Sequence, residues 1–520
     1  MDLTDATLVD LRQALHERRT TALALARGYL DRIEAYDRAG FALNSVREVN
    51  PDALEIAGSL DGGQPSKRLP LAGIPILVKD NIATGDRQHT TAGSLALEGA
   101  RAKEDATVVK RLRAAGALIL GKANLTEFAN ILAIDMPSGY SSLGGQVKNA
   151  YVPRLDGNGV PVVTPGGSSS GSAVAVAAGL CAAAIGTETS GSLLSPATQN
   201  GIVTVKPTVG LISRAGIIPI AHSQDTAGPM TRTVRDAAIL LNVLAARDPL
   251  DPATRKLQRP VDYTACLDKE GLKGARIGVP SDPADPANDV YFAPQTSRTQ
   301  AAMRDVVVTL EAAGATIVHA NIPTIGWMGG PGTSMAVLNT NPHSPTRHKP
   351  VNRPIVSIYE LKHDLELYLR DWATETSMQS LADIVAFNEA NPERALRFGQ
   401  DLFLAAAATS GDLSEPEYKS ARAMDVRSAS TLGLDAYMDA HRLDAVLFPG
   451  RAGAGIAAKS GYPSVQVPAG FTSGADGKDT PDYPIGATFT GRAWGEPTLL
   501  RLAYAYEQVS QLRRPPSGPP

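Results

Sequence analysis

The chain has very little cysteine, with only Cys181 and Cys266 among its 520 residues. Two thiols so far apart in so long a chain exclude a disulfide framework and any zinc site built on cysteine. They are typical of structural thiols in a reducing compartment.

The sequence also lacks an excess of charge of either sign. Its 50 lysines and arginines stand against 53 aspartates and glutamates, which leaves a formal net charge of −3 at pH 7. This balance provides no basic field for phosphate backbones, so nucleic acid is not expected as a partner.

Long hydrophobic runs are missing as well. The most apolar stretch, SAVAVAAGLCAAAIG from Ser172, is short and rich in alanine and glycine, which predicts a buried helix rather than a membrane span. The first residues, MDLTDATLVDLRQALHERRT, lack the charged and apolar regions of a secretory signal. We therefore expect a cytoplasmic chain, unless an export signal has been removed.

What the sequence does contain is a succession of helix and strand patterns. Two helical patterns precede residue 60, with Thr20 or Thr21 as an N-cap between them, and an apolar stretch from Leu71 to Val78 predicts a buried strand that ends at Lys79. The segments VVKRLRAAGALILGKANL and MRDVVVTLEAAGATIVHA each read as a helix, a glycine turn and a strand.

These units predict an α/β fold with a mixed, largely parallel central sheet covered by helices on both faces. We expect a single large α/β/α domain over residues 1–520. Within it we distinguish outer N-terminal helices (1–60), a catalytic core (65–250) and a variable helical segment (about 326–442) that shapes the substrate pocket.

Two glycine- and serine-rich segments are the best candidates for chemistry. They are TPGGSSSGSAVAVAAG, from Thr164 to Gly179, and IGTETSGSLLSPA, from Ile185 to Ala197. Turns of this composition leave backbone N–H groups available for an anion. A phosphate site is disfavoured, because the lysine of the GxxxxGK[ST] pattern is absent.

Two kinds of serine hydrolase remain open on the residues alone. Gly167, Ser169 and Gly171 satisfy the G-x-S-x-G pattern of α/β-hydrolases, but His441, which follows the candidate serine as that pattern demands, resembles a helix-end residue. The other candidate base is Lys79. A lysine at a strand end is often solvated, but burial would lower its pKa and make the neutral amine a proton acceptor.

Several segments, in their order along the chain, are similar to motifs of the amidase signature family. Within that family they most resemble those of the bacterial peptide amidases. They include PILVKDNI, GGSSSGSAVAVAAG, GTETSGSLLSPA, VKPTVGLISRAGIIPI and SQDTAGPMTRTVRDAA. The resemblance covers most of the chain except about 326–442. It implies the amidase signature fold and a cofactor-independent, metal-free amide hydrolase.

The resemblance also implies which residues do the chemistry. Lys79 would be the base, Ser168 the proton relay after a cis Gly167–Ser168 peptide bond, and Ser192 the nucleophile that forms an acyl-enzyme. The oxyanion hole would consist of backbone N–H groups of Thr189, Ser190, Gly191 and Ser192. A further implied contact, Ile134, lines the acyl site.

The expected substrates are C-terminal peptide amides or other bulky alkyl or aryl amides, with carbamates or esters as alternatives on the same site. The expected partner is therefore a small-molecule or peptide amide, and we expect binding to neither nucleic acid nor a membrane. The chain is expected to be a monomer or a homodimer. An amidotransferase subunit that feeds ammonia to charged tRNA is less favoured, and so is an inactive scaffold, because all three implied catalytic residues are present.

The chain departs from the family pattern in two places. Where many relatives have Gly-Gly-Ser followed by Ile-Arg, this chain has Ser190, Gly191, Ser192, Leu193 and Leu194. Without the arginine, we expect the turn to lack a carboxylate or structural anchor. We also expect its neighbourhood to be apolar. The loop 149–165 is also longer than in typical relatives, which predicts a remodelled substrate entrance.

Overall fold

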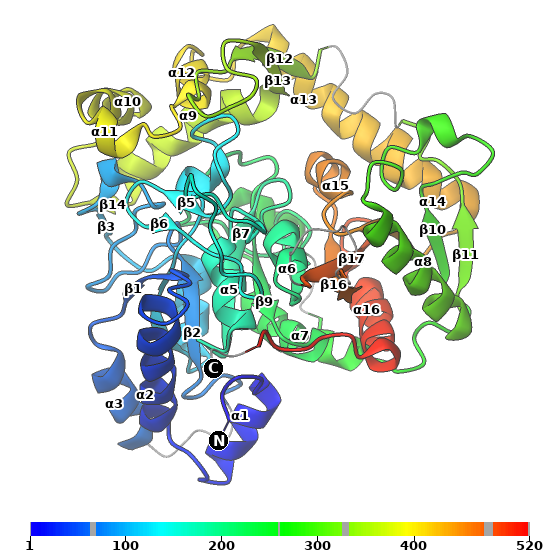
Figure 1. Cartoon of the computed structure of the whole chain (residues 1–520), viewed down its shortest axis with the longest axis horizontal. Coiled ribbons are helices and arrows are strands. Elements are labelled where there is room, and N and C mark those ends of the chain that lie inside the picture. The colour runs from blue at the N-terminus through cyan, green and yellow to red at the C-terminus, as the bar shows by residue number, and fades with distance from the viewer. Residues whose placement is uncertain (1, 63–68, 258–260, 325–331, 473–481, 518–520) are drawn as a thin grey trace.

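An eleven-stranded sheet runs through the computed structural model (Figure 1). The structure describes residues 2–62, 69–257, 261–324, 332–472 and 482–517. From edge to edge, the strands are β1 (Val46–Val49), β4 (Leu118–Ala123), β2 (Pro75–Lys79), β7 (Ala183–Glu188), β9 (Thr226–Thr231), β8 (Val203–Lys206), β16 (Ser464–Phe471), β17 (Pro484–Thr490), β15 (Ala445–Pro449), β10 (Arg276–Val279) and β11 (Thr316–His319).

The central strands are buried on both faces, as their sequences predict. Strand β2 reads PILVK and strand β7 reads AAIGTE, and every residue of both is buried. Such runs without polar alternation are typical of parallel strands that are covered on both faces. The edge strands β1 and β11 are partly exposed. The centre of the sheet is therefore the place where side chains are most completely withdrawn from water.

The sheet is mixed, as predicted, but the expectation that it is largely parallel is wrong. Strand β2 pairs in parallel with β4 and β7, and β10 with β15 and β11. The other six neighbouring pairs are antiparallel. The predicted helix–strand units, α4 (Thr107–Ala114) with β4 and α8 (Ser297–Ala312) with β11, are confirmed. Between β8 and β9 the chain returns through loops instead, and such a return allows an antiparallel pair.

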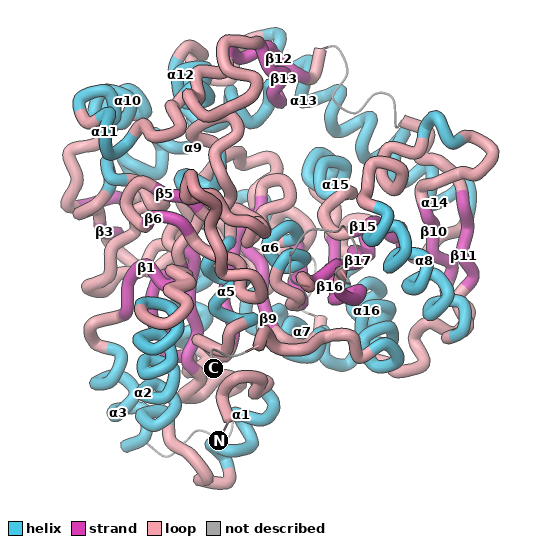
Figure 2. Tube along the Cα trace, viewed as in Figure 1, coloured by secondary structure: helices cyan, strands magenta, loops and turns pink. Residues whose placement is uncertain are grey.

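Helices cover the sheet, and in Figure 2 many of them lie toward the periphery, while α5 (Ser170–Ala177) and α6 (Leu194–Gln199) lie near the middle of the view among strands and loops. The helices include α1 (Leu8–His16), α2 (Ala22–Arg32), α3 (Ala53–Gly62), α4 (Thr107–Ala114), α5 (Ser170–Ala177), α6 (Leu194–Gln199), α7 (Val234–Leu244), α8 (Ser297–Ala312), α15 (Ala454–Ser460) and α16 (Glu496–Ser510). The predicted cap is confirmed at Thr21, whose side chain accepts from the N–H of Ala24 at the start of α2.

Most of residues 332–442 form a helical layer at the top of Figure 1, around a second core that the layer shares with residues 92–136, and the last part of the segment lies at the right of the view beside β10. The helices of this segment are α9 (Ile355–Asp371), α10 (Leu381–Ala390), α11 (Pro392–Ala395), α12 (Asp401–Ala407), α13 (Pro416–Ala429) and α14 (Ala436–His441). The predicted helical character is confirmed, but the sequence did not reveal an antiparallel pair, β12 (Ser334–Leu338) and β13 (Pro350–Pro354). The first part of the predicted segment, 326–331, lies outside the described residues.

Short elements complete the described chain. Strand β3 (Arg101–Ala102) pairs with β14 (Ala373–Thr374), and β5 (Tyr140–Ser141) with β6 (Gly145–Gln146). Single turns of 3-10 or π helix span Ile33–Arg38, Leu95–Leu97, Glu127–Asn130, Pro252–Lys256, Tyr263–Cys266, Pro286–Asn288 and Ser430–Asp435. Among the described residues, no helix combines the length and the apolar character that a bilayer crossing requires.

Candidate active site

Lys79 and Ser168 meet at the carboxyl end of β2, as the sequence predicts. The Lys79 Nζ lies 2.8 Å from the Ser168 Oγ, and both residues are fully buried. The same nitrogen donates to Thr187, whose Oγ1 lies 2.8 Å away and whose carbonyl oxygen lies 3.4 Å away. Because β2 and β7 are parallel neighbours, their carboxyl ends share one edge of the sheet, and this places Lys79 beside Thr187.

The surroundings of Lys79 favour its neutral form. Burial, which disfavours the charged amine, lowers the pKa of Lys79 to about 7, although Asp225 and Glu188 act in the opposite direction. A neutral amine has two N–H donors and one lone pair. With both donors directed at Thr187, the lone pair is free to accept a proton from the Ser168 hydroxyl.

The turn before Ser168 holds this serine against the second glycine- and serine-rich segment. The Gly167–Ser168 peptide bond is cis, as expected. Gly166 has a φ of +69°, and a Cβ there would lie 2.5 Å from the Cα of Pro196, so no larger residue fits. The N–H of Ser169 donates to the carbonyl of Ser192 at 3.1 Å. Ser168 and Ser192 are therefore held on adjoining stretches of backbone.

Ser192 lies in the turn that follows β7. The buried Glu188 fixes this turn, because its Oε2 accepts from the N–H groups of Leu193 at 2.7 Å and Leu194 at 3.0 Å. Gly191 has a φ of +89°, a conformation that favours glycine. The side chain of Ser192 has no hydrogen-bond partner within the described part of the chain, and the residue keeps a small exposed fraction of 7%.

The predicted oxyanion hole has the donors that it needs. No described residue accepts from the N–H groups of Ser190, Gly191 or Ser192. The side chain of Thr189 donates to Asp225, which fixes the start of the turn. Unpaired N–H groups beside a serine hydroxyl are suited to an oxygen that becomes negatively charged during acyl transfer.

One expectation about this turn is wrong. Leu193 and Leu194 were expected to give the neighbourhood of the turn an apolar surface, but both are fully buried. The side chain of Leu193 packs under the sheet, where a Cβ at Gly186 or Gly228 would meet it. Glu188 holds the backbone N–H groups of both leucines, which turns their side chains toward the core.

Ile134 is also buried, at 1% exposure, in the core that the helical layer shares with the loop before Ser168. Its N–H donates to Asp401 at 2.8 Å, and its carbonyl accepts from Asn341 at 2.8 Å. The predicted acyl-site contact is thus tied to residues 332–442. The long loop 149–165 is tied to the same layer, because Arg397 donates to the carbonyl of Asn158 at 2.7 Å.

The structure does not bring together the residues of the α/β-hydrolase alternative. The Ser169 hydroxyl is buried and donates to the Thr187 carbonyl at 3.0 Å. His441 ends α14, where its ring contacts that of Tyr437. Neither side chain contacts the other, so Ser169 lacks the base that this alternative requires.

Comparison with known proteins shows which family the chain belongs to. The family model described as Amidase matches residues 24–500. The chain belongs to the amidase family. It is an enzyme that hydrolyses carbon–nitrogen bonds of amides.

Other amidases match along the whole length. The crystal structure of a peptide amidase from Stenotrophomonas maltophilia superimposes with a TM-score of 0.84 at 42% identity, covering 98% of both chains. A probable amidase of Arabidopsis thaliana is 38% identical over 98% of this chain and 91% of its own. One chain of the Glutamyl-tRNA(Gln) amidotransferase of Methylocella silvestris is 34% identical over 99% of this chain and 98% of its own.

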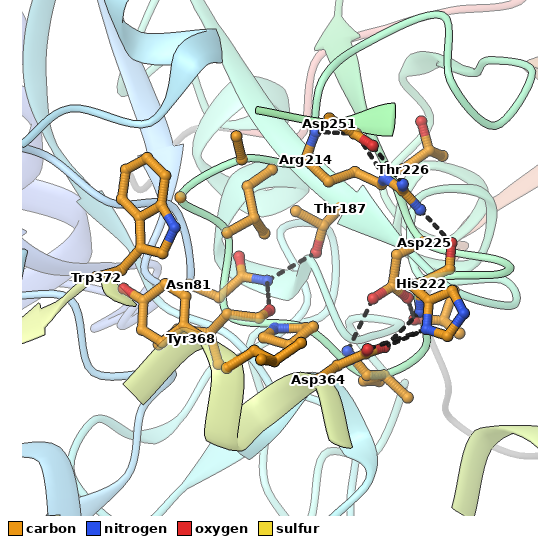
Figure 3. Close-up of a pocket in the computed structure, with 18 of the residues that line it drawn as sticks. Asn81, Thr187, Arg214, His222, Asp225, Thr226, Asp251, Asp364, Tyr368 and Trp372 are labelled. Carbon is orange, nitrogen blue, oxygen red and sulfur yellow. Dashed lines mark hydrogen bonds and ion pairs between the residues drawn. The ribbon is translucent and has the colours of Figure 1, made fainter. Parts of the chain in front are cut away.

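Beside the buried lysine, this amidase has a cavity of about 240 Å³ (Figure 3). In the view of Figure 3, Trp372 and Tyr368 form an aromatic side, and His222 and Asp364 lie opposite them. Thr187, which contacts Lys79, also lines the cavity. The cavity therefore adjoins the candidate active site and offers apolar and polar surface to a substrate.

Sequence reasoning missed three residues around the amidase site, namely Asn81, Thr187 and Asp225. The side-chain amide of Asn81 donates to Thr187 Oγ1 at 3.1 Å, so this oxygen accepts hydrogen bonds from both Asn81 and Lys79. Asp225 accepts from the side chain of Thr189 and from the N–H groups of Ile220 and Ala221, and burial raises its pKa to about 6. Their positions within VKDN, GTET and SQDT, next to the predicted residues, were the available signal.

Among the described residues, His222, Glu360 and Asp364 are the one group with metal-like spacing. His222 Nδ1 lies 2.9 Å from Asp364, and Glu360 accepts from Tyr418 at 2.7 Å and from the N–H of Ser223 at 3.0 Å. These polar atoms already have partners in the protein, so the group is explained as an internal hydrogen-bond network.

Proposed function

We propose that this amidase cleaves its substrate through Lys79, Ser168 and Ser192, with an acyl-enzyme intermediate on Ser192. The observation that carries the proposal is the 2.8 Å contact between the Lys79 Nζ and the Ser168 Oγ. Because the burial of Lys79 lowers its pKa to about 7, a large fraction of the amine is neutral at physiological pH and able to accept a proton.

In the acylation step, the Ser192 Oγ attacks the amide carbon while its proton passes to Ser168 and the Ser168 proton passes to Lys79. The carbonyl oxygen becomes negatively charged and is bound by the N–H groups of the turn from Thr189 to Ser192. The carbon–nitrogen bond then breaks. Ser168 delivers a proton to the departing amine and is reprotonated by the Lys79 ammonium.

In the deacylation step, water replaces the amine. Its proton passes through Ser168 to Lys79 as its oxygen attacks the ester carbon. When the ester bond breaks, the proton returns to the Ser192 oxygen. Water and amide are consumed, a carboxylic acid and an amine are released, and the three side chains regain their starting protonation.

The substrate class that we propose is the C-terminal amide of a peptide, or another bulky alkyl or aryl amide. The likeness to a peptide amidase over the whole chain supports this assignment. So does the cavity beside Lys79, whose aromatic side, formed by Tyr368 and Trp372, suits an apolar group. Carbamates and esters share the acylation step and belong in the same test.

The test is an assay of the purified single chain on peptide amides, anilides, carbamates and esters, with release of ammonia, amine or alcohol as the readout. We expect peptide amides to be hydrolysed without another protein. If the purified chain releases ammonia only when partner chains and charged tRNA are added, the amidotransferase alternative is correct.

The pH dependence provides a separate prediction. Because only neutral Lys79 accepts a proton, kcat should rise about tenfold per pH unit on the acidic side and level off above pH about 7. Initial rates at saturating substrate across this range measure the effect. A rate that falls as the pH rises through 7 would show that the charged amine is the active form and contradict the assignment.

A further inference from the structure

Arg451 brings a positive charge to the turn that carries the nucleophile. It lies in the loop between β15 and α15. A Cβ on Gly191 would lie 3.8 Å from the Cδ and 4.0 Å from the Nη1 of Arg451. Since neighbouring Cα atoms are about 3.8 Å apart, the guanidinium lies within roughly 12 Å of the Ser192 hydroxyl.

The charge on Arg451 is not used inside the protein. The side chain is exposed, and no described residue forms a hydrogen bond, ion pair or ring contact with it. Arg214, which lines the cavity beside Lys79, differs in this respect, because it is paired with Asp251 at 2.6 Å. The guanidinium of Arg451 therefore has its five donors available to a ligand.

The turn itself, from Thr189 to Leu194, carries no cationic side chain. Leu194 stands where many relatives have an arginine, and its side chain is buried. The nearest atom to a Cβ on Gly191 is the Cβ of Ala454, at 3.5 Å, which is apolar. A substrate bound to Ser192 thus meets an isolated positive charge at a short distance.

We propose that Arg451 selects substrates that carry a carboxylate close to the scissile amide. The inference rests on the proposed function of Ser192 as nucleophile. A guanidinium binds a carboxylate through two charge-assisted hydrogen bonds. Because an extended peptide spans about 3.3 to 3.6 Å per residue, the carboxylate belongs to the residue that bears the scissile amide or to the one before it.

The test uses two matched series of acetylated dipeptide amides, in which glutamate, glutamine or lysine occupies the last or the preceding position. Because the site is partly exposed, we expect the wild-type kcat/KM to favour glutamate over glutamine by about tenfold in one series, mainly through KM. Arg451→Ala should remove this preference and change glutamine turnover less than about twofold. Arg451→Glu should reverse it in favour of lysine.

Arg12→Ala is the matched control, since Arg12 is exposed on α1 and also has no partner within the described residues. It should leave the preference unchanged. Two results would overturn the role of Arg451 while leaving the proposed function intact. One is that the wild-type enzyme hydrolyses the glutamine amides as well as the glutamate amides in both series. The other is that Arg451→Ala lowers kcat/KM equally for all substrates. If none of the amides is hydrolysed, the proposed function itself is wrong, and the role of Arg451 fails with it.

Discussion

Ser192→Ala is expected to abolish acyl-enzyme formation, because it removes the hydroxyl that we propose as the nucleophile. Turnover of any amide should fall by about 10⁴-fold or more, as when a serine nucleophile is removed elsewhere. The burst of acylation and labelling by a serine-directed fluorophosphonate should both disappear. Stopped-flow kinetics and mass spectrometry of the labelled protein measure these effects.

Two other serines serve as comparisons for Ser192. Ser168→Ala keeps the nucleophile but breaks the proton relay, so slow labelling should survive while turnover falls by about 10² to 10⁴. Ser190→Ala is the matched control within the same turn, because its exposed side chain is not part of the relay and its N–H group remains. The assignment is wrong if Ser192→Ala retains wild-type turnover, or if substitution of a histidine alone abolishes activity.

Lys79→Ala should separate amides from activated esters. An amide has a poor leaving group that needs a proton, so its turnover should fall at least as far as in Ser168→Ala, by about 10² to 10⁴. A p-nitrophenyl ester leaves without protonation and should lose much less. The ratio of the two kcat/KM values, measured on one preparation, should therefore fall steeply.

Lys122→Met is the control for removing a buried lysine. Lys122 is also fully buried, and burial lowers its pKa to about 8, but its Nζ donates to the Ile82 carbonyl at 2.6 Å and to Thr90 at 3.0 Å. Its substitution can reduce the amount of folded enzyme, which fluorophosphonate titration corrects for. The amide-to-ester ratio should be unchanged. An unchanged ratio in Lys79→Ala would show that Lys79 is not the base.

The sequence predicted those parts of the site that lie within continuous motifs. The apolar run before Lys79 predicted a buried strand, and the likeness to the amidase signature motifs implied that Ser168 lies beside it. Arg451 and Thr187 were not predicted as site residues. Arg451 reaches the nucleophile turn from a loop more than 250 residues away in the sequence, and its proximity depends on packing that no local pattern encodes.

The same limit applies to the sheet and to the turn around Ser192. Helix–strand units correctly predicted that part of the sheet is parallel, but loops that return directly contain no comparable pattern, so the antiparallel pairs were underestimated. Leu193 and Leu194 were predicted to make the surface near the turn apolar, because their hydrophobicity is visible in the sequence. The hydrogen bonds of Glu188 to the backbone N–H groups of both leucines, which help to set the direction of their side chains, are not visible in the sequence.

The parallel pairing of β2 with β7 also affects how the enzyme acquires its activity. Lys79 and Thr187 are 108 residues apart in the sequence, and the contact between them exists only once these two strands are neighbours. Closing so long a segment costs chain entropy that helices formed locally do not recover. Helix content and catalytic competence should therefore be gained at different times during refolding, with activity following the assembly of the sheet centre.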